Sequence, residues 1–172
     1  MLDGVVEIPL SGRPVRSSPL PGRPSAPLLE HFVVGPENRL VEVAVRSLLN
    51  DEEDRYSPIV FCGPSGTGKS HLALGLTAAW KTRFPKRPAA CVPAVDFARE
   101  LAATMQTKTV DDFGARYRRL SLLVLDDLEH LVGKAAGQRE LTFTLDALEA
   151  AGSHVVVTAQ RVPGEWTGLM AG

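Results

Sequence analysis

Eight residues from Gly63 to Ser70 have the types and spacing of a loop that binds phosphate. They read Gly-Pro-Ser-Gly-Thr-Gly-Lys-Ser, which fits the pattern of a glycine, any four residues, then Gly-Lys and Ser or Thr. The glycines allow backbone N–H groups and the start of the next helix to point at one anion. Lys69 would then reach the β- and γ-phosphates of a nucleotide, and the Ser70 hydroxyl would ligate Mg²⁺. The alternative is a Gly/Ser-rich turn that happens to precede a lysine.

The residues on either side of this loop supply the context that the pattern requires. The apolar run 58–62 precedes it and is typical of a buried strand, and residues 71–80 follow it with the apolar face of a packed helix. Strand, glycine loop and helix in this order favour a nucleotide site over a chance turn. The predicted nucleotide-binding residues here are Gly63, Pro64, Ser65, Gly66, Thr67, Gly68, Lys69, Ser70 and His71.

Two carboxylates at the end of another apolar run, 120–125, form the second half of the predicted site. Asp126 would hold Mg²⁺ through water, and Asp127 would act as a base that orients water against the γ-phosphate. Two acids after a strand are weak support alone, but they are the expected partner of a phosphate loop. Thr158 and Gln160 end the next apolar run, where they either read the γ-phosphate or merely cap the strand.

Strand-like and helical patterns alternate from residue 28 onward. Strands are predicted at 58–62, 89–92, 120–125 and 154–158, and helices at 37–49, 71–83, 97–104, 109–119 and 137–151. Asp96 is predicted to cap the helix at 97–104, and Thr109 with Asp112 has capping-box spacing for the next one. The alternation predicts an α/β fold, a parallel sheet flanked by helices, with ligand at the carboxyl ends of the strands. The phosphate loop and the two acids should therefore converge.

The composition is that of one soluble globular domain. The 172 residues are 44% apolar and 23% charged, and a net charge of −1 gives no overall indication of nucleic-acid binding. No apolar run approaches the roughly 20 residues of a transmembrane segment, and the N-terminus lacks a signal-peptide pattern. Cys62 and Cys91 lie in apolar runs, so we predict two buried, reduced cysteines and a cytoplasmic location.

Residues 1–27 differ in composition from the remainder. Prolines recur between Pro9 and Pro27 with serines, glycines and arginines among them, which predicts a disordered Pro/Ser/Arg-rich linker. A weak electrostatic role for the arginines is an alternative to a simple solvated linker. We therefore divide the chain into a linker at 1–27 and a nucleotide-binding domain at 28–172.

Residues 28–164 resemble the AAA+ ATP-binding domain of the bacterial replication initiators of the DnaA family. The matching segments are 32–38, 63–71, 113–127 and 131–148, and Thr158, Arg161 and Pro163 resemble the segment around the family's first sensor. The second and third resemble the Walker A and Walker B motifs, whereas the fourth is more particular to the family. The first resembles the entry segment that lies against the adenine, which implies nucleotide contacts from Val33 and Val34.

The resemblance implies an ATP-dependent switch in DNA replication. It implies that ATP and Mg²⁺ are the ligands, that Ser70 and Asp126 hold the metal, and that Asp127 and Gln160 are the catalytic residues of a weak Mg²⁺-dependent ATPase. It also implies that residues 96–119 contact single-stranded origin DNA, and that a further C-terminal domain reads double-stranded origin boxes. Self-assembly in the ATP form is implied, with the replicative helicase and acidic phospholipids as further partners.

Three departures from the family pattern limit this expectation. Gln160 stands where the first sensor is usually Asp, and Ala136 stands where a basic residue commonly faces single-stranded DNA. The sequence also ends at Gly172, before the fifth core strand, the arginine finger, the second sensor and the helical lid. We therefore expect an incomplete domain that holds nucleotide but does not hydrolyse it alone.

Other functions remain open on the sequence. A DnaA-related regulator or helicase loader would share the fold and act on a partner protein, and a helix-turn-helix after this region would distinguish an initiator from it. A P-loop kinase or transferase would need an acceptor pocket, for which the sequence offers no signature. A non-catalytic interaction module is the remaining alternative, suggested by Gln160.

Overall fold

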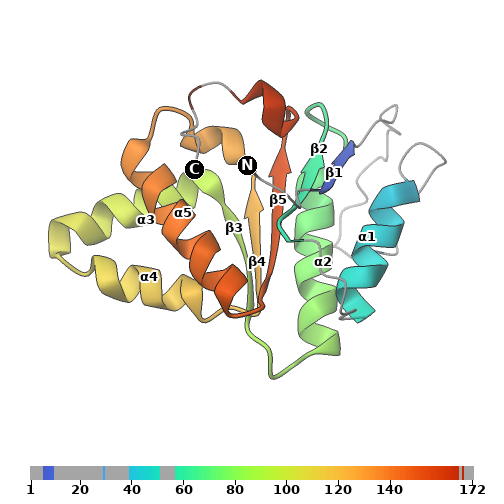
Figure 1. Ribbon diagram of the computed structural model, residues 1–172, viewed down its shortest axis with the longest axis horizontal. Coiled ribbons are helices and arrows are strands. Elements are labelled where there is room, and N and C mark those ends of the chain that lie inside the picture. The colour runs from blue at the N-terminus through green and yellow to red at the C-terminus, as the bar shows by residue number, and fades with distance from the viewer. Residues whose placement is uncertain (1–5, 10–28, 30–38, 51–56, 167, 169–172) are drawn as a thin grey trace, which may run out of the picture.

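The computed structural model describes residues 6–9, 29, 39–50, 57–166 and 168. Its centre is one sheet in the order β1-β2-β5-β4-β3 (Figure 1). The strands are β1 (Val6–Pro9), β2 (Ile59–Cys62), β3 (Ala89–Pro93), β4 (Leu122–Asp126) and β5 (His154–Ala159). Every pairing between neighbours is parallel, which confirms the predicted α/β fold.

Helices cover both faces of the sheet. They are α1 (Arg39–Asn50), α2 (Lys69–Arg83), α3 (Ala94–Thr107), α4 (Val110–Arg118) and α5 (Ala135–Ala150), with short 3₁₀ turns η3 (Leu128–Leu131) and η4 (Pro163–Glu165). Helices α1 and α2 lie on one face, and α3, α4 and α5 lie on the other (Figure 1). Among the helices that the structure describes, none is long and apolar enough to cross a membrane.

The alternation of side chains along β4 divides the interior into two cores. Leu122 and Val124 pack with the residues of α1 and α2, whereas Leu123 and Leu125 pack with those of α3, α4 and α5. All four are fully buried. A strand covered on both faces needs apolar residues at every position, which is why β4 reads as an unbroken apolar run.

Strand β1 lies inside the segment that the composition predicts to be a linker. It pairs with β2 in the register Val6↔Ile59 to Pro9↔Cys62, so the sheet has a fifth strand that the sequence pattern did not predict. The linker interpretation is therefore wrong at Val6–Pro9. The remainder of 1–27 lies outside the described residues.

The starts of α3 and α4 differ from the predicted caps. Helix α3 begins at Ala94 after Pro93, so Asp96 lies in its first turn and forms an ion pair with Arg99 at 2.9 Å. The predicted Asp96 cap is wrong because the helix starts earlier. Thr109 is the N-cap residue of α4 as predicted, but its hydroxyl makes no capping bond and contacts the Thr107 hydroxyl at 2.8 Å.

Three aromatic rings pack together between α3 and α4. Phe97, Phe113 and Tyr117 lie with ring centroids 4.8 to 5.0 Å apart in tilted or edge-to-face arrangements. All three are buried, and Phe97 is fully so. Such contacts add to the gain from burying the rings, so this cluster holds the two helices together as a unit.

The Phe97→Ala variant should lose about 3–5 kcal/mol of unfolding free energy, because the ring is fully buried and leaves a cavity. Phe143→Ala is the matched control, since that ring is 55% exposed and its loss should change stability by no more than about 0.5 kcal/mol. Urea denaturation followed by circular dichroism measures both. Equal losses in the two variants would contradict the assignment of Phe97 to the core.

Candidate functional site

The loop from Gly63 to Ser70 joins β2 to α2. Gly66 and Gly68 have φ angles of +84° and +89°, which residues other than glycine adopt only at a cost in free energy. Gly68 is the N-cap residue of α2, and no side chain caps this helix start. The uncapped N–H groups of the first turn are therefore available to an anion, and the helix dipole favours negative charge there.

Lys69 lies at the base of this loop. Its side chain is 8% exposed, and the Nζ ammonium donates to the carbonyl oxygens of Gly63 at 2.7 Å and Pro64 at 2.9 Å. A lysine has three N–H donors, so these two bonds leave one for a phosphate oxygen. The ammonium thus stabilises the curved backbone of the loop and places a positive charge beside the N-terminus of α2.

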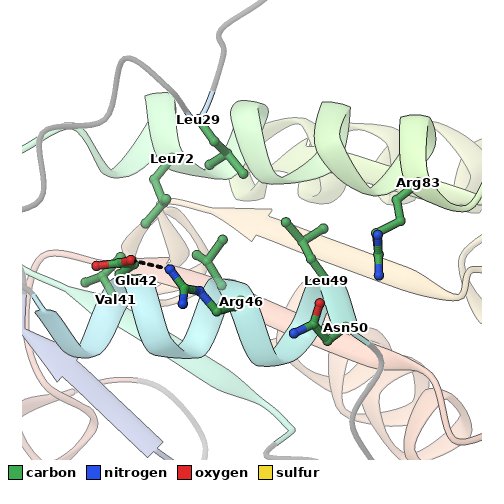
Figure 2. Close-up of a pocket in the computed structure, with 9 residues that line it drawn as sticks. Leu29, Val41, Glu42, Arg46, Leu49, Asn50, Leu72 and Arg83 are labelled. Carbon is green, nitrogen blue, oxygen red and sulfur yellow. Dashed lines mark hydrogen bonds and ion pairs between the residues drawn. The ribbon is translucent and has the colours of Figure 1, made fainter.

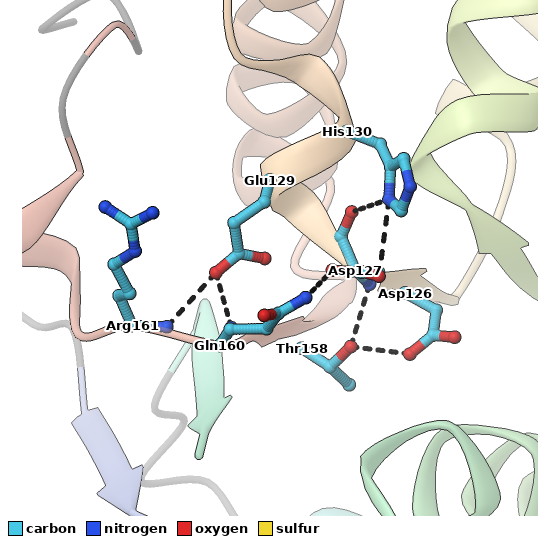
Figure 3. A network of polar contacts seen from close by, with 7 residues as sticks. All are labelled: Asp126, Asp127, Glu129, His130, Thr158, Gln160 and Arg161. Atoms are coloured by element: carbon cyan, nitrogen blue, oxygen red, sulfur yellow. Dashed lines mark hydrogen bonds and ion pairs between the residues drawn. The ribbon is translucent and has the colours of Figure 1, made fainter. Parts of the chain in front are cut away.

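The two acids of the second motif lie where β4 ends. Thr158, on the neighbouring strand β5, donates its hydroxyl to Asp126 Oδ1 at 2.5 Å and accepts the backbone N–H of Asp127 at 2.9 Å (Figure 3). Thr158 is fully buried. One hydroxyl therefore fixes both acids.

Asp127 has an unusual backbone conformation. Its φ is +58° and its ψ is +65°, in the left-handed region that Asp and Asn tolerate better than most residues. Gln160 Nε2 donates to its Oδ1 at 3.4 Å, and His130 Nδ1 lies 3.3 Å from its Oδ2 (Figure 3). Both oxygens of this carboxylate thus have neighbours that fix its orientation.

These segments meet around one cavity of about 280 Å³. Its lining consists of Ser65, Gly66, Gly68, Lys69, Ser70, His71, Asp126, Asp127, Thr158 and Gln160. The predicted convergence of the phosphate loop with the two acids is therefore present in the structure. Gly63, Pro64 and Thr67 belong to the loop but do not line the cavity, and Val33 and Val34 lie outside the described residues.

Two residues of the network were not singled out from the sequence. Glu129 Oε1 accepts the backbone N–H groups of Gln160 and, at 3.1 Å, of Arg161. His130 is the other, through its contact with Asp127. The available signal was their position two and three residues after Asp127, and residues in such a position are commonly solvent-exposed.

Cys91 lies on β3, next to the strand that ends at Asp126. Burial first, and then the charge of Asp126, raise the pKa of the Cys91 thiol to about 11. The thiol is therefore protonated at neutral pH and a poor nucleophile. Cys62 is buried, as predicted, whereas Cys91 is only partly buried.

A larger cavity of about 380 Å³ lies between α1 and α2 (Figure 2). Aliphatic side chains dominate its lining, and Glu42 pairs with Arg46 there at 2.7 Å. It contains neither the glycine loop nor the acids of β4. Arg46 and Arg83 also line it, but its described lining includes no glycine loop that could cradle a triphosphate, so the smaller cavity is the candidate site.

Thr158→Val should destabilise the fold by about 1–3 kcal/mol, because it leaves the Asp127 N–H without its acceptor and Asp126 without its donor. Thr144→Val is a matched control, since Thr144 is also fully buried but its hydroxyl has no partner among the described residues. That change should be neutral or stabilising. Thermal melting of both variants measures the difference, and an equal loss would contradict the role given to Thr158.

Comparison with known proteins identifies the family. A model of the bacterial DnaA ATPase domain matches residues 25–171, which is most of the chain. The chain belongs to the DnaA family. The DnaA protein of Sphingopyxis alaskensis is 34% identical over 142 residues, covering 83% of this chain and 31% of that protein. The DnaA of Thermomicrobium roseum is 31% identical over 134 residues and is covered to 29%. The chain thus spans about a third of these DnaA relatives.

Solved DnaA structures share the fold. AMPPCP-bound DnaA from Aquifex aeolicus is 30% identical with a TM-score of 0.78, and the match covers 83% of this chain and 44% of that one. Domain III of Thermotoga maritima DnaA is 26% identical with a TM-score of 0.79, covering 88% and 62%. These matches confirm the AAA+ fold predicted from the DnaA resemblance, and a nucleotide analogue is bound in the Aquifex relative.

A helicase loader shares the architecture at a greater distance. The DnaC loader is 15% identical with a TM-score of 0.61, over 80% of this chain and 77% of that one. At this identity the match concerns the fold alone. The family assignment therefore rests on the match to the DnaA ATPase-domain model over residues 25–171.

Proposed function

We propose that this domain is the ATP-binding switch of a replication initiator that binds the chromosomal origin, assembles in its ATP form and helps to open the duplex. The observation that carries the proposal is the single cavity in which the phosphate loop meets Asp126, Asp127 and Gln160. A switch must bind ATP and ADP differently, and residues beyond the phosphate loop supply that difference. The activity is a weak ATPase in the assembled protein.

The residues of this cavity suit Mg²⁺. Mg²⁺ is usually held by one or two carboxylates together with phosphates and water, and not by a complete cage of protein ligands. Among the described residues no cluster of three or more His, Cys, Asp or Glu side chains that could hold a metal ion is present. Ser70 and Asp126 would hold the ion, which would supply positive charge against the phosphates.

Each remaining polar residue has a distinct task in this proposal. Lys69 donates to the β- and γ-phosphates. Asp127 accepts the proton of the attacking water at a carboxylate oxygen, and the Gln160 amide donates to the γ-phosphate. Gln160 is neutral, so it can contribute a hydrogen bond but no charge.

Single-stranded DNA is the proposed ligand of residues 96–119, and a DnaA relative has been solved with AMPPCP and single-stranded DNA bound. Two arginines of α4 are engaged within the protein, since Arg116 pairs with Glu100 at 2.5 Å and Arg118 with Glu140 at 2.7 Å. The hydrogen bond from Arg116 lowers the pKa of Glu100, which favours the ionised pair. These arginines therefore support the helices more than they offer charge to phosphate.

A groove of about 550 Å³ between α3 and the start of α5 supports this ligand assignment. Lys134 and Arg99 line it beside small and apolar side chains, and Arg99 also pairs with Asp96. The described residues of the groove therefore offer positive charge to phosphates and no aromatic ring on which a base could stack. Ala136 also lines it and contributes no charge.

The other proposed partners lie beyond this domain. A C-terminal domain would read double-stranded origin boxes, and the replicative helicase and acidic phospholipids would be further contacts. We propose a cytoplasmic location, in which the cysteines stay reduced.

Nucleotide-dependent assembly on DNA tests the proposed function. Sedimentation velocity of the full-length protein is measured with a non-hydrolysable ATP analogue or with ADP, each with and without an oligothymidine strand. We expect larger assemblies only with the ATP analogue, and further growth when the strand is added. Equal behaviour with the two nucleotides would contradict a switch. Nucleotide-dependent binding of a protein partner, with no effect of DNA, would favour a regulator or loader instead.

A further inference from the structure

The Glu129 carboxylate binds backbone groups of a loop about thirty residues further along the chain. It lies in the turn η3 directly after Asp127, and its Oε1 accepts two consecutive backbone N–H groups, from Gln160 and Arg161. Its Oε2 is inaccessible to solvent and has no hydrogen-bond partner among the described residues. A carboxylate oxygen in that state costs free energy, so the arrangement calls for an explanation.

The two bonds fix the loop that carries Gln160. This loop leaves the end of β5, and it has no regular structure until η4 begins at Pro163. Bonds from N–H groups to a carboxylate are stronger than bonds between neutral groups, and two on one oxygen restrict both position and orientation. Glu129 thus determines where the Gln160 side chain starts (Figure 3).

The Gln160 side chain extends from this fixed point toward the phosphate cavity. It lines the cavity, and its Nε2 lies 3.4 Å from Asp127 Oδ1, a long hydrogen bond that a ligand atom could replace. Glu129 itself does not line that cavity. Its Oε1 is already occupied and its Oε2 is enclosed, so it is suited neither to bind a metal nor to act as a base.

We propose that Glu129 is a positioning residue that holds the Gln160 loop, so that the Gln160 amide faces Asp127 and the γ-phosphate position. The inference rests on the proposed function, because it concerns discrimination between ATP and ADP at the same site. Glu129 acts only through Gln160. Removing either residue should therefore have the same consequence, and removing both should add little.

A double-mutant cycle tests this coupling. The dissociation constants of ADP and a non-hydrolysable ATP analogue are measured for the wild type, Glu129→Ala, Gln160→Ala and the double variant. Each single change should reduce the preference for the ATP analogue about tenfold, the equivalent of one lost hydrogen bond, with ADP affinity altered less than about twofold. The double variant should lie within about twofold of the single ones.

Two further variants separate positioning from other effects. Glu129→Gln keeps an oxygen that can accept both N–H groups, so it should restore most of the preference. Glu165→Ala removes a negative charge from an exposed nearby residue and should change nothing. Amide hydrogen exchange at Gln160 and Arg161 should accelerate at least tenfold in Glu129→Ala and remain slow in Glu129→Gln.

The outcomes distinguish this inference from the proposed function. A wild type that binds ATP and ADP equally overturns both. A wild type that prefers ATP, with that preference intact in Glu129→Ala or with additive losses in the double variant, overturns the positioning role alone. Loss of preference in Glu129→Gln as large as in Glu129→Ala would also overturn it, because the charge and not the held loop would then be responsible.

Discussion

Replacing Lys69 with alanine should weaken ATP binding by at least about 100-fold. The variant removes the ammonium beside the uncapped start of α2, where hydrogen bonds to phosphate are charge-assisted and each contributes about 1.5–3 kcal/mol. It also removes the two bonds to the carbonyls of Gly63 and Pro64, so the loop loses its internal support. Titration calorimetry with ATP and Mg²⁺ measures the loss directly.

Lys81→Ala is the matched control for this change. Lys81 is exposed in the last turn of the same helix, so its removal alters net charge and helix composition equally but leaves the loop untouched. Its ATP affinity should stay within about twofold of the wild type, in keeping with the small effect of exposed charges. An ATP affinity of Lys69→Ala within about twofold of the wild type would refute the assignment of the site.

Asp127→Asn should slow ATP hydrolysis by about 10²–10⁴-fold while leaving ATP affinity within about threefold, because it removes the base and retains the shape of the side chain. Asparagine is preferable to alanine here. The backbone φ of +58° is tolerated by Asp and Asn, whereas alanine would add strain to the chemical effect. Single-turnover hydrolysis by the assembled full-length protein measures the rate.

Asp146→Asn serves as its control, since Asp146 is exposed on α5 away from the cavity and should not affect the rate. A parallel titration with ATP shows whether slow hydrolysis in Asp127→Asn reflects a slower chemical step or a loss of ATP binding. If Asp127→Asn hydrolyses ATP as fast as the wild type, another group accepts the proton and the base assignment is wrong.

Local sequence signals were sufficient to predict the main architecture. The unbroken apolar run of β4 requires burial on both faces, and the glycine loop between β2 and α2 has few structural alternatives. These two facts, together with parallel strand order, bring Lys69 and Asp126 to one edge of the sheet. The same reasoning could not locate Glu129, because its bonds run to backbone N–H groups about thirty residues further along the chain.

The errors have a common physical origin in tertiary contacts. Asp is a common N-cap residue, which is why Asp96 was predicted to cap α3. The helix instead extends back to Ala94, whose side chain is fully buried. Val6–Pro9 has no strong strand pattern among its neighbouring prolines, and its strand exists through pairing with β2. Short segments of this kind take their conformation from the surface that they meet, which a local pattern does not contain.

The order of the strands bears on how this protein is made. Strand β5 lies between β2 and β4, which do not pair with each other, yet it is the last of the five to leave the ribosome. The β1–β2 pair and the β3–β4 pair therefore cannot join into one sheet, and keep unpaired apolar edges, until residues as far as Ala159 have been synthesised. Intermediates that expose apolar surface and unpaired strand edges are prone to aggregate. A stalled chain that ends before His154 should consequently be insoluble, although it already contains the entire phosphate loop.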